Sequence, residues 1–187
     1  MPNPDTSRLF LAIDAPEPVA LSLAAIAAPT PGISWTPPER LHLTLRFLGD
    51  TPNERIPALC ERLRRLGVAP FILPVETLGV FPPRGQPRVL WCGVGRGHPH
   101  LHQLRQRVDD TVLALGLEAD LKSFVPHFTL ARVAGAAKPA AIAQWLHLHR
   151  EFAAPPFRLE RFALYSSELQ PAGAVHRLIA AFPLEAG

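Results

Sequence analysis

Two matching motifs in the chain carry residue types suited to acid/base chemistry. The first motif is HLTL at residues 42–45 and the second is HFTL at residues 127–130, so a His-apolar-Thr-Leu pattern occurs twice. The copies are separated by close to half of the 187-residue chain, and each lies on a predicted strand that follows a stretch containing a helix. An internal duplication is the economical explanation.

Strand geometry gives this pattern its chemical content. Side chains alternate between the two faces of a strand, so His42 and Thr44 project together, as do His127 and Thr129, while the apolar residues beside them project into the core. If a pseudo-twofold axis relates the two halves, the four polar side chains can converge on one cleft. Two imidazoles, with an unperturbed pKa near 6.5, then form an acid and base pair near neutral pH. The two hydroxyls can donate hydrogen bonds to a phosphate held between them.

The apolar spacing of the rest of the chain predicts the elements that position these motifs. We expect strands where apolar residues alternate or run together between turn residues, and helices where they recur every three or four positions. Strands and helices are mixed in both halves, with enough consecutive strands to favour antiparallel sheets and the α+β class. The expected strands are 8–14, 41–48, 71–80, 88–94, 127–133, 157–166 and 175–184, and the expected helices are 18–28, 52–66, 99–115 and 139–149.

Length and composition indicate a single domain, residues 1–187. The chain has 48% hydrophobic and 19% charged residues, enough to bury most of its apolar surface. It has no run of about 18 apolar residues, so we expect no transmembrane helix. The N-terminal residues lack the features of a secretory signal, so we expect a cytoplasmic protein. The net charge of +3 permits a polyanionic partner without requiring one.

The remaining cysteines and histidines do not predict a metal site. Cys60 and Cys92 have no partner at metal-ligand spacing, and we expect both to be reduced core residues. His98, His100 and His102 lie at the start of a predicted helix, where residues two apart diverge, whereas a zinc pair on a helix needs a spacing of four. We therefore expect a reaction that uses neither a metal nor another cofactor.

Around the two motifs, the sequence resembles the RNA 2′,3′-cyclic phosphodiesterases, also called 2′-5′ RNA ligases, of the two-histidine phosphoesterase superfamily. The resemblance covers nearly the whole chain. The segments that carry it are RLFLAI at 8–13, WTPPERLHLTLRFLG at 35–49, FPPRGQPRVLWCGV at 81–94, FVPHFTLARV at 124–133, and the closing segment 169–184.

The resemblance implies a bilobal α+β fold, with two similar lobes of antiparallel sheet, outer helices and an active cleft between the lobes. It implies metal-free hydrolysis of a 2′,3′-cyclic phosphate at an RNA end to a 2′-phosphomonoester, with reversible 2′-5′ joining as a related activity. His42 and His127 would be the acid and the base, and Thr44 and Thr129 would hold the non-bridging phosphate oxygens. Arg132 matches an arginine that follows the second motif and would counter the phosphate charge. The expected partner is RNA with a cyclic phosphate end or a related nucleotide, bound by a monomer that does not associate with membranes.

Strand alternation and the resemblance differ on which arginine contacts the phosphate. Alternation places Arg46 on the His42 face, but it places Arg132 on the face opposite His127 unless the strand ends or bulges by that point. Arg46 is therefore a second candidate for the phosphate contact. Alternation also places Phe47 in the core rather than at a position where it would stack on a base.

Two other functions fit the same residues. One is a non-catalytic RNA-binding or nucleotide-binding module that kept the cleft, which degeneration of one motif would favour, although both motifs are intact. The other is a related enzyme that acts on a different small cyclic or 2′-5′-linked nucleotide. Symmetry also leaves open which histidine is the acid, and the resemblance favours His42 as the acid and His127 as the base.

Overall fold

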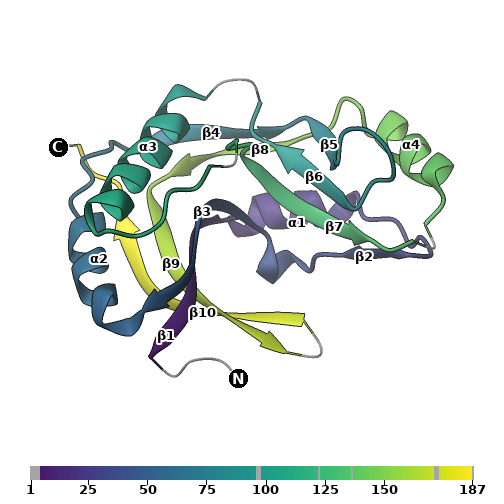
Figure 1. Ribbon diagram of the computed structural model, residues 1–187. Coiled ribbons are helices and arrows are strands. Elements are labelled where there is room, and N and C mark those ends of the chain that lie inside the picture. The colour runs from purple at the N-terminus through teal and green to yellow at the C-terminus, as the bar shows by residue number, and fades with distance from the viewer. Residues whose placement is uncertain (1–4, 96–97, 122, 136, 171–172, 187) are drawn as a thin grey trace.

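The structure is a computed structural model, and it describes residues 5–95, 98–121, 123–135, 137–170 and 173–186. Helices and strands alternate along the first part of the chain, and three strands close it (Figure 1). The strands are β1 (Thr6–Asp14), β2 (Ile33–Trp35), β3 (His42–Pro52), β4 (Phe71–Glu76), β5 (Leu78–Phe81), β6 (Val89–Gly93), β7 (His127–Val133), β8 (Ala153–Leu159), β9 (Arg161–Gln170) and β10 (Gly173–Pro183). The helices are α1 (Glu17–Ala25), α2 (Ile56–Leu63), α3 (Pro99–Ala114) and α4 (Pro139–Leu148), with 3-10 turns η1 (Pro38–Arg40) and η2 (Asn53–Arg55).

Within the described ranges, the strands form one large sheet and one small sheet. The large sheet has the order β10-β9-β1-β3-β7-β6-β5, with β2 paired to β7, and the small sheet pairs β4 with β8. The pairings between these strands are antiparallel. The expectation of an α+β fold built on antiparallel sheets is therefore confirmed, and β3 and β7, which carry the two motifs, are neighbours in the middle of the large sheet.

Two of the expected strands are in fact each split between the sheets. The apolar run 71–80 forms β4 of the small sheet and β5 of the large sheet, with Thr77 between them at a φ of 72°. A β-branched residue rarely adopts a positive φ, so Thr77 marks a sharp change of direction. The run 157–166 is divided in the same way between β8 and β9. Apolar spacing finds such a strand but does not show where the chain leaves one sheet for the other.

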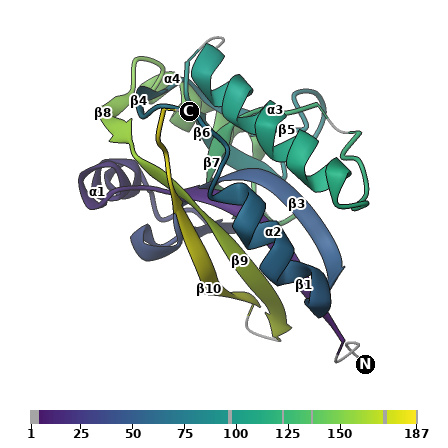
Figure 2. The ribbon, with the colours of Figure 1, turned by 90° about the vertical axis from the view of Figure 1, so that its left-hand side faces the viewer.

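Helices α2 and α3 lie side by side on one side of the large sheet (Figure 2). Helix α3 buries Leu101, Leu104, Val108 and Val112, whose spacing of three and four residues puts them on one face. Cys60 and Cys92 are buried and free of disulfides, which confirms the expectation that they are core residues. None of the described helices is long and apolar enough to cross a membrane.

Candidate active site

The two motifs meet across the central strand pair of the large sheet. In the antiparallel ladder of β3 and β7, Leu43 lies opposite Phe128, and both side chains are fully buried. This register brings His42 next to Thr129 and Thr44 next to His127 on the adjacent rungs. Because side chains alternate along each strand, all four point away from the core face that Leu43 and Phe128 occupy. The structure thus brings the four sequence-predicted residues together on one face.

Each histidine is oriented by a backbone carbonyl two residues before it. Nδ1 of His42 lies 2.9 Å from the Arg40 carbonyl oxygen, and Nδ1 of His127 lies 2.6 Å from the Val125 carbonyl oxygen. A carbonyl oxygen can only accept, so Nδ1 carries the proton in both rings. The neutral tautomer therefore leaves Nε2 of both histidines unprotonated and able to accept a proton.

Burial lowers the pKa of both histidines. For His42, desolvation is the largest effect, and the Arg40 carbonyl and the charge of Asp14 oppose it by favouring the imidazolium. For His127, desolvation is again the largest effect, opposed by the Val125 carbonyl, while the charge of His42 lowers the pKa further. A bound phosphate would raise both values, because a nearby negative charge favours the charged form of an imidazole.

A β-bulge interrupts alternation in each motif strand, directly after the threonine. In β3, the register against β1 shifts so that Leu45 is the extra residue between the pairs Ala12–Thr44 and Leu11–Arg46. At the next two positions each side chain points to the face opposite the one that alternation predicts. Arg46 therefore lies on the core face with Leu11, and Phe47 points to the His42 face.

The matching bulge in β7 has the opposite consequence for its arginine. The register against β6 shifts between Leu90 and Trp91, so that Trp91 pairs with Thr129, Val89 pairs with Arg132, and Leu130 is the extra residue. Since Val89 and Trp91 lie on the same face of β6, Arg132 lies on the same face as Thr129. Arg132 is exposed on that face.

Arg46 is instead part of a buried ion network beneath the site. Its side chain is only 2% exposed, forms an ion pair with Asp109 of α3 and donates a hydrogen bond to the Glu118 carbonyl oxygen. Arg105 joins the same network, with Nε 2.8 Å from Asp109 and a terminal nitrogen donating 2.6 Å to the carbonyl oxygen of the bulged Leu45. The expectation that Arg46 faces the His42 side and contacts phosphate is therefore wrong, because the bulge turns it inward.

Phe47 is the second residue that the bulge displaces. Alternation placed it in the core, but its side chain is 65% exposed and its ring centroid lies 6.1 Å from that of Phe10. The expectation of a core position is wrong for the same reason as for Arg46. Nothing local in the sequence distinguishes a bulged strand from a regular one of the same composition.

Aromatic rings that the motifs do not reveal flank each histidine. The His42 ring lies 5.4 Å from Phe10 and 5.4 Å from His176, measured between centroids. The His127 ring lies 5.0 Å from Phe81 and 6.1 Å from Trp91. Each imidazole is thus walled by aromatic side chains on the side away from its partner motif.

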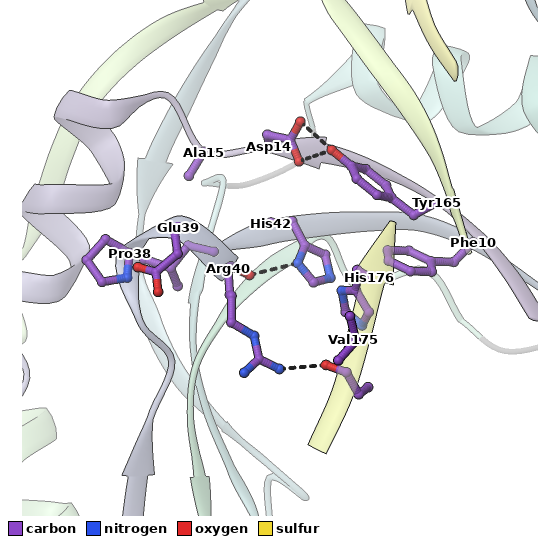
Figure 3. A pocket seen from close by; sticks show the side chains of 12 residues that line it. Phe10, Asp14, Ala15, Pro38, Glu39, Arg40, His42, Tyr165, Val175 and His176 are labelled. Carbon is purple, nitrogen blue, oxygen red and sulfur yellow. Dashed lines mark hydrogen bonds between the residues drawn. The ribbon is translucent and has the colours of Figure 1, made fainter. Parts of the chain in front are cut away.

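A pocket of about 520 Å³ opens beside His42 (Figure 3). Figure 3 shows His176 and Phe10 next to His42, and Tyr165 joined to both carboxylate oxygens of Asp14 by hydrogen bonds of 2.8 and 2.7 Å. These residues come from β1, β9 and β10, far from the motifs in sequence, so no spacing pattern could have identified them.

The histidines outside the motifs do not gather into a metal site. His98 and His100 each stack on Phe71, at 5.0 and 5.5 Å between centroids. Across the described part of the chain, no group of three His, Cys, Asp or Glu side chains is arranged to hold a metal ion.

The chain matches known proteins over most of its length. The family model for LigT-like phosphoesterases matches residues 13–91 and 95–176. A protein of Thermus thermophilus named RNA 2′,3′-cyclic phosphodiesterase is 37% identical over 192 residues, covering 95% of this chain and 90% of its own length. A protein of Thermotoga maritima with the same name is 31% identical over 188 residues, covering 96% and 97%.

Solved structures share the fold. A crystal structure from Thermus thermophilus superposes with a TM-score of 0.78 at 31% identity, covering 96% of this chain and 98% of that one. Escherichia coli LigT in complex with 3′-AMP superposes with a TM-score of 0.77 at 24% identity, covering 96% and 98%, and supports the fold alone. The resemblance found in the sequence is confirmed, and the chain is an enzyme of the LigT-like phosphoesterase family.

Proposed function

We propose that this protein hydrolyses 2′,3′-cyclic phosphate ends of RNA to 2′-phosphomonoesters by two-histidine acid/base catalysis that needs no metal. The observation that carries the proposal is the convergence of His42, Thr44, His127 and Thr129 on one face across the Leu43–Phe128 pair. Relatives covering nearly the whole chain bear the name RNA 2′,3′-cyclic phosphodiesterase, which supports the same substrate class.

The two imidazoles act at opposite ends of an in-line displacement, one on the attacking water and the other on the leaving oxygen. Nε2 of neutral His127 takes a proton from the attacking water as its oxygen bonds to phosphorus. The bond from phosphorus to O3′ breaks, and protonated His42 gives its Nε2 proton to the departing oxygen. The product carries a 2′-phosphomonoester and a free 3′-hydroxyl, and the pair returns to its starting state by exchanging one proton each with solvent.

The surroundings of the two rings support His42 as the acid. The charge of Asp14 and the Arg40 carbonyl favour the imidazolium of His42 against burial and the charge of Arg40, whereas no carboxylate is among the causes that shift the pKa of His127. A carboxylate near the ring stabilises its protonated form, which is the form that an acid needs. The assignment agrees with the one that the resemblance favours.

Thr44, Thr129 and Arg132 supply the phosphate contacts. Their polar groups lie on the histidine face, where hydroxyl donors and a guanidinium can stabilise the charge that builds on the non-bridging oxygens. Arg46 is excluded from this role, because its guanidinium is buried on the other face with Asp109.

A related activity follows from the same geometry. If the 5′-hydroxyl of a second RNA occupies the place of the water, the displacement yields a 2′-5′ linkage, and the reaction is reversible. The stacked Phe81 and Trp91 rings, 5.2 Å apart, lie beside His127, on the side from which that hydroxyl would approach. They support joining as a second reaction of the site.

We further infer that the chain is a single domain of two duplicated lobes. The evidence is that two details of local geometry occur in both motifs. In each, the histidine Nδ1 donates a hydrogen bond to the carbonyl oxygen two residues earlier, and a bulge lies at the leucine after the threonine. A monomer in the cytoplasm stays a prediction.

The proposal is tested with the purified protein in excess EDTA and an RNA that ends in a 2′,3′-cyclic phosphate. We expect turnover, with a product that comigrates with the 2′-phosphate standard and not with the 3′-phosphate standard. Loss of activity in EDTA that zinc or manganese restores would contradict the acid/base reading. Binding without turnover would favour a non-catalytic module, and turnover confined to other cyclic nucleotides would favour the related enzyme.

A further inference from the structure

The pocket beside His42 has its own chemistry, distinct from that of the phosphate contacts. We infer, resting on the proposed function, that this pocket holds the nucleobase of the nucleoside that carries the cyclic phosphate, and that Glu39 makes it selective for guanine. The pocket has a volume of about 520 Å³, and its lining includes Phe10, Asp14, Glu39, Arg40, Tyr165 and His176 (Figure 3).

The position of the pocket follows from the direction of the reaction. The departing O3′ belongs to the terminal nucleoside, so that nucleoside lies on the side of the acid, His42. The pocket is lined by His42 and does not include His127. The base attached to the same ribose is therefore the part of the substrate nearest to it.

The charges in the pocket disfavour the RNA backbone. Asp14 and Glu39 contribute two carboxylates, and the single guanidinium of Arg40 is bonded at 2.8 Å to the Ala174 carbonyl oxygen. Burial and the charges of His42 and Arg40 keep the pKa of His176 low, so this ring adds no positive charge at neutral pH. A backbone phosphate next to Asp14 and Glu39 would be repelled, whereas a neutral group that donates hydrogen bonds would be attracted.

One wall of the pocket is aromatic. Phe10 is only 3% exposed and lies behind this wall, with Tyr165 stacked against it at 5.4 Å and His176 edge-on at 4.7 Å. His176 is exposed and lies 5.4 Å from His42. A planar base beside these rings gains stacking contacts that do not depend on its identity.

The carboxylate that is free, Glu39, selects the base. The Tyr165 hydroxyl donates its one proton to the Asp14 carboxylate, whose two oxygens lie 2.8 and 2.7 Å away, while no side-chain hydrogen bond or ion pair within the described residues engages Glu39. Guanine presents two adjacent donors, N1–H and N2–H, which match the two oxygens of a carboxylate. Adenine and cytosine present one donor beside an acceptor, and uracil presents a single donor.

The experiment compares guanosine with inosine, which lacks only the N2 amino group. We measure kcat/KM for guanosine and inosine 2′,3′-cyclic phosphates, and in parallel the Kd of the products guanosine and inosine 2′-phosphate by calorimetry. Inosine lacks one charge-assisted hydrogen bond to Glu39. We therefore expect the guanosine substrate to have a kcat/KM about tenfold higher, and the guanosine product a Kd about tenfold lower. In Glu39→Ala the ratio should fall to about one, whereas Glu54→Gln, a change of an exposed carboxylate in η2, should leave it unchanged.

The outcomes separate this inference from the proposed function. A ratio near one in the unmodified protein, or a ratio that survives in Glu39→Ala, would overturn the guanine site even if both nucleotides are hydrolysed. A ratio of Kd values that collapses in Glu39→Ala, with no hydrolysis of either nucleotide, would support the site and remove the proposed reaction. His176→Ala should weaken the binding of both products by the same factor, because stacking does not discriminate between the two bases. His176→Phe should restore the binding of both.

Discussion

Arg46 and Arg132 follow the two motifs at nearly the same distance, and the structure places them on opposite faces of the sheet. Arg132 is exposed on the histidine face, so under the proposed function Arg132→Ala removes a charged contact to the phosphate. Such contacts contribute about 1.5 to 3 kcal/mol, which corresponds to a loss in kcat/KM of about 10-fold to 150-fold. The free energy of unfolding should change by no more than about 0.5 kcal/mol, because the side chain is on the surface.

Arg46→Ala should do the reverse. It removes the partner of Asp109 and of the Glu118 carbonyl, at a site where the guanidinium is 2% exposed. Breaking a buried pair costs roughly 3 to 5 kcal/mol, and we expect the lower end, about 3 kcal/mol, because Asp109 is 27% exposed and keeps its bond to Arg105. For a chain of this length, Tm should fall by about 6 to 12 °C.

Both variants are measured by thermal unfolding and by initial rates well below Tm, where all proteins are folded. Arg62→Ala, which changes an exposed arginine of α2, is the matched control and should leave both readouts unchanged. If Arg46→Ala lost activity at an unchanged Tm while Arg132→Ala kept it, the faces assigned from the two bulges would be wrong.

Three further changes test the division of roles. Asp14→Asn removes a charge that raises the pKa of His42, so the pKa of His42 should fall. Less of the acid is then protonated at a given pH, and the alkaline limb of the kcat/KM profile should move to lower pH. Movement of the acidic limb instead would make His42 the base. A substrate with sulfur in place of O3′ needs little protonation of its leaving group, and it should rescue His42→Ala but not His127→Ala; rescue of the latter alone would reverse the assignment. Thr44→Val and Thr129→Val should each lower kcat by roughly 10-fold to 100-fold with little change in Tm, and Thr→Ser at either site should recover most of the loss; unchanged rates would exclude the hydroxyls from the phosphate site.

Sequence reasoning identified the parts of the site that depend on regular geometry. The alternation of His42, Leu43 and Thr44, repeated from His127, predicts two strands with polar side chains on one face, and the β3–β7 pair has this arrangement. The α+β class could be predicted from the order of strands and helices. Strands repeat their apolar residues every two positions and helices every 3.6, and a pattern that extends over several residues can be recognised in the sequence.

The parts that sequence reasoning missed depend on irregular geometry or on long-range contacts. The bulge at Leu45 moves Arg46 and Phe47 to the faces opposite those expected, and no single residue type encodes it. It is supported by Arg105, which donates to the Leu45 carbonyl from another element 60 residues away. The pocket wall formed by Tyr165 and His176 likewise needs β9 and β10 folded beside β1, which local spacing does not report.

The central claim is that His42 and His127 act together on one phosphate. The most direct test measures kcat/KM on RNA ending in a 2′,3′-cyclic phosphate for His42→Ala, His127→Ala and the double variant, with thermal unfolding to confirm that each is folded. Each single variant should lose about 10² to 10⁴ in rate, and the double variant should be within about tenfold of the slower single one, because the groups work as a unit. A single variant that keeps its rate, or losses that multiply in the double variant, would contradict the account.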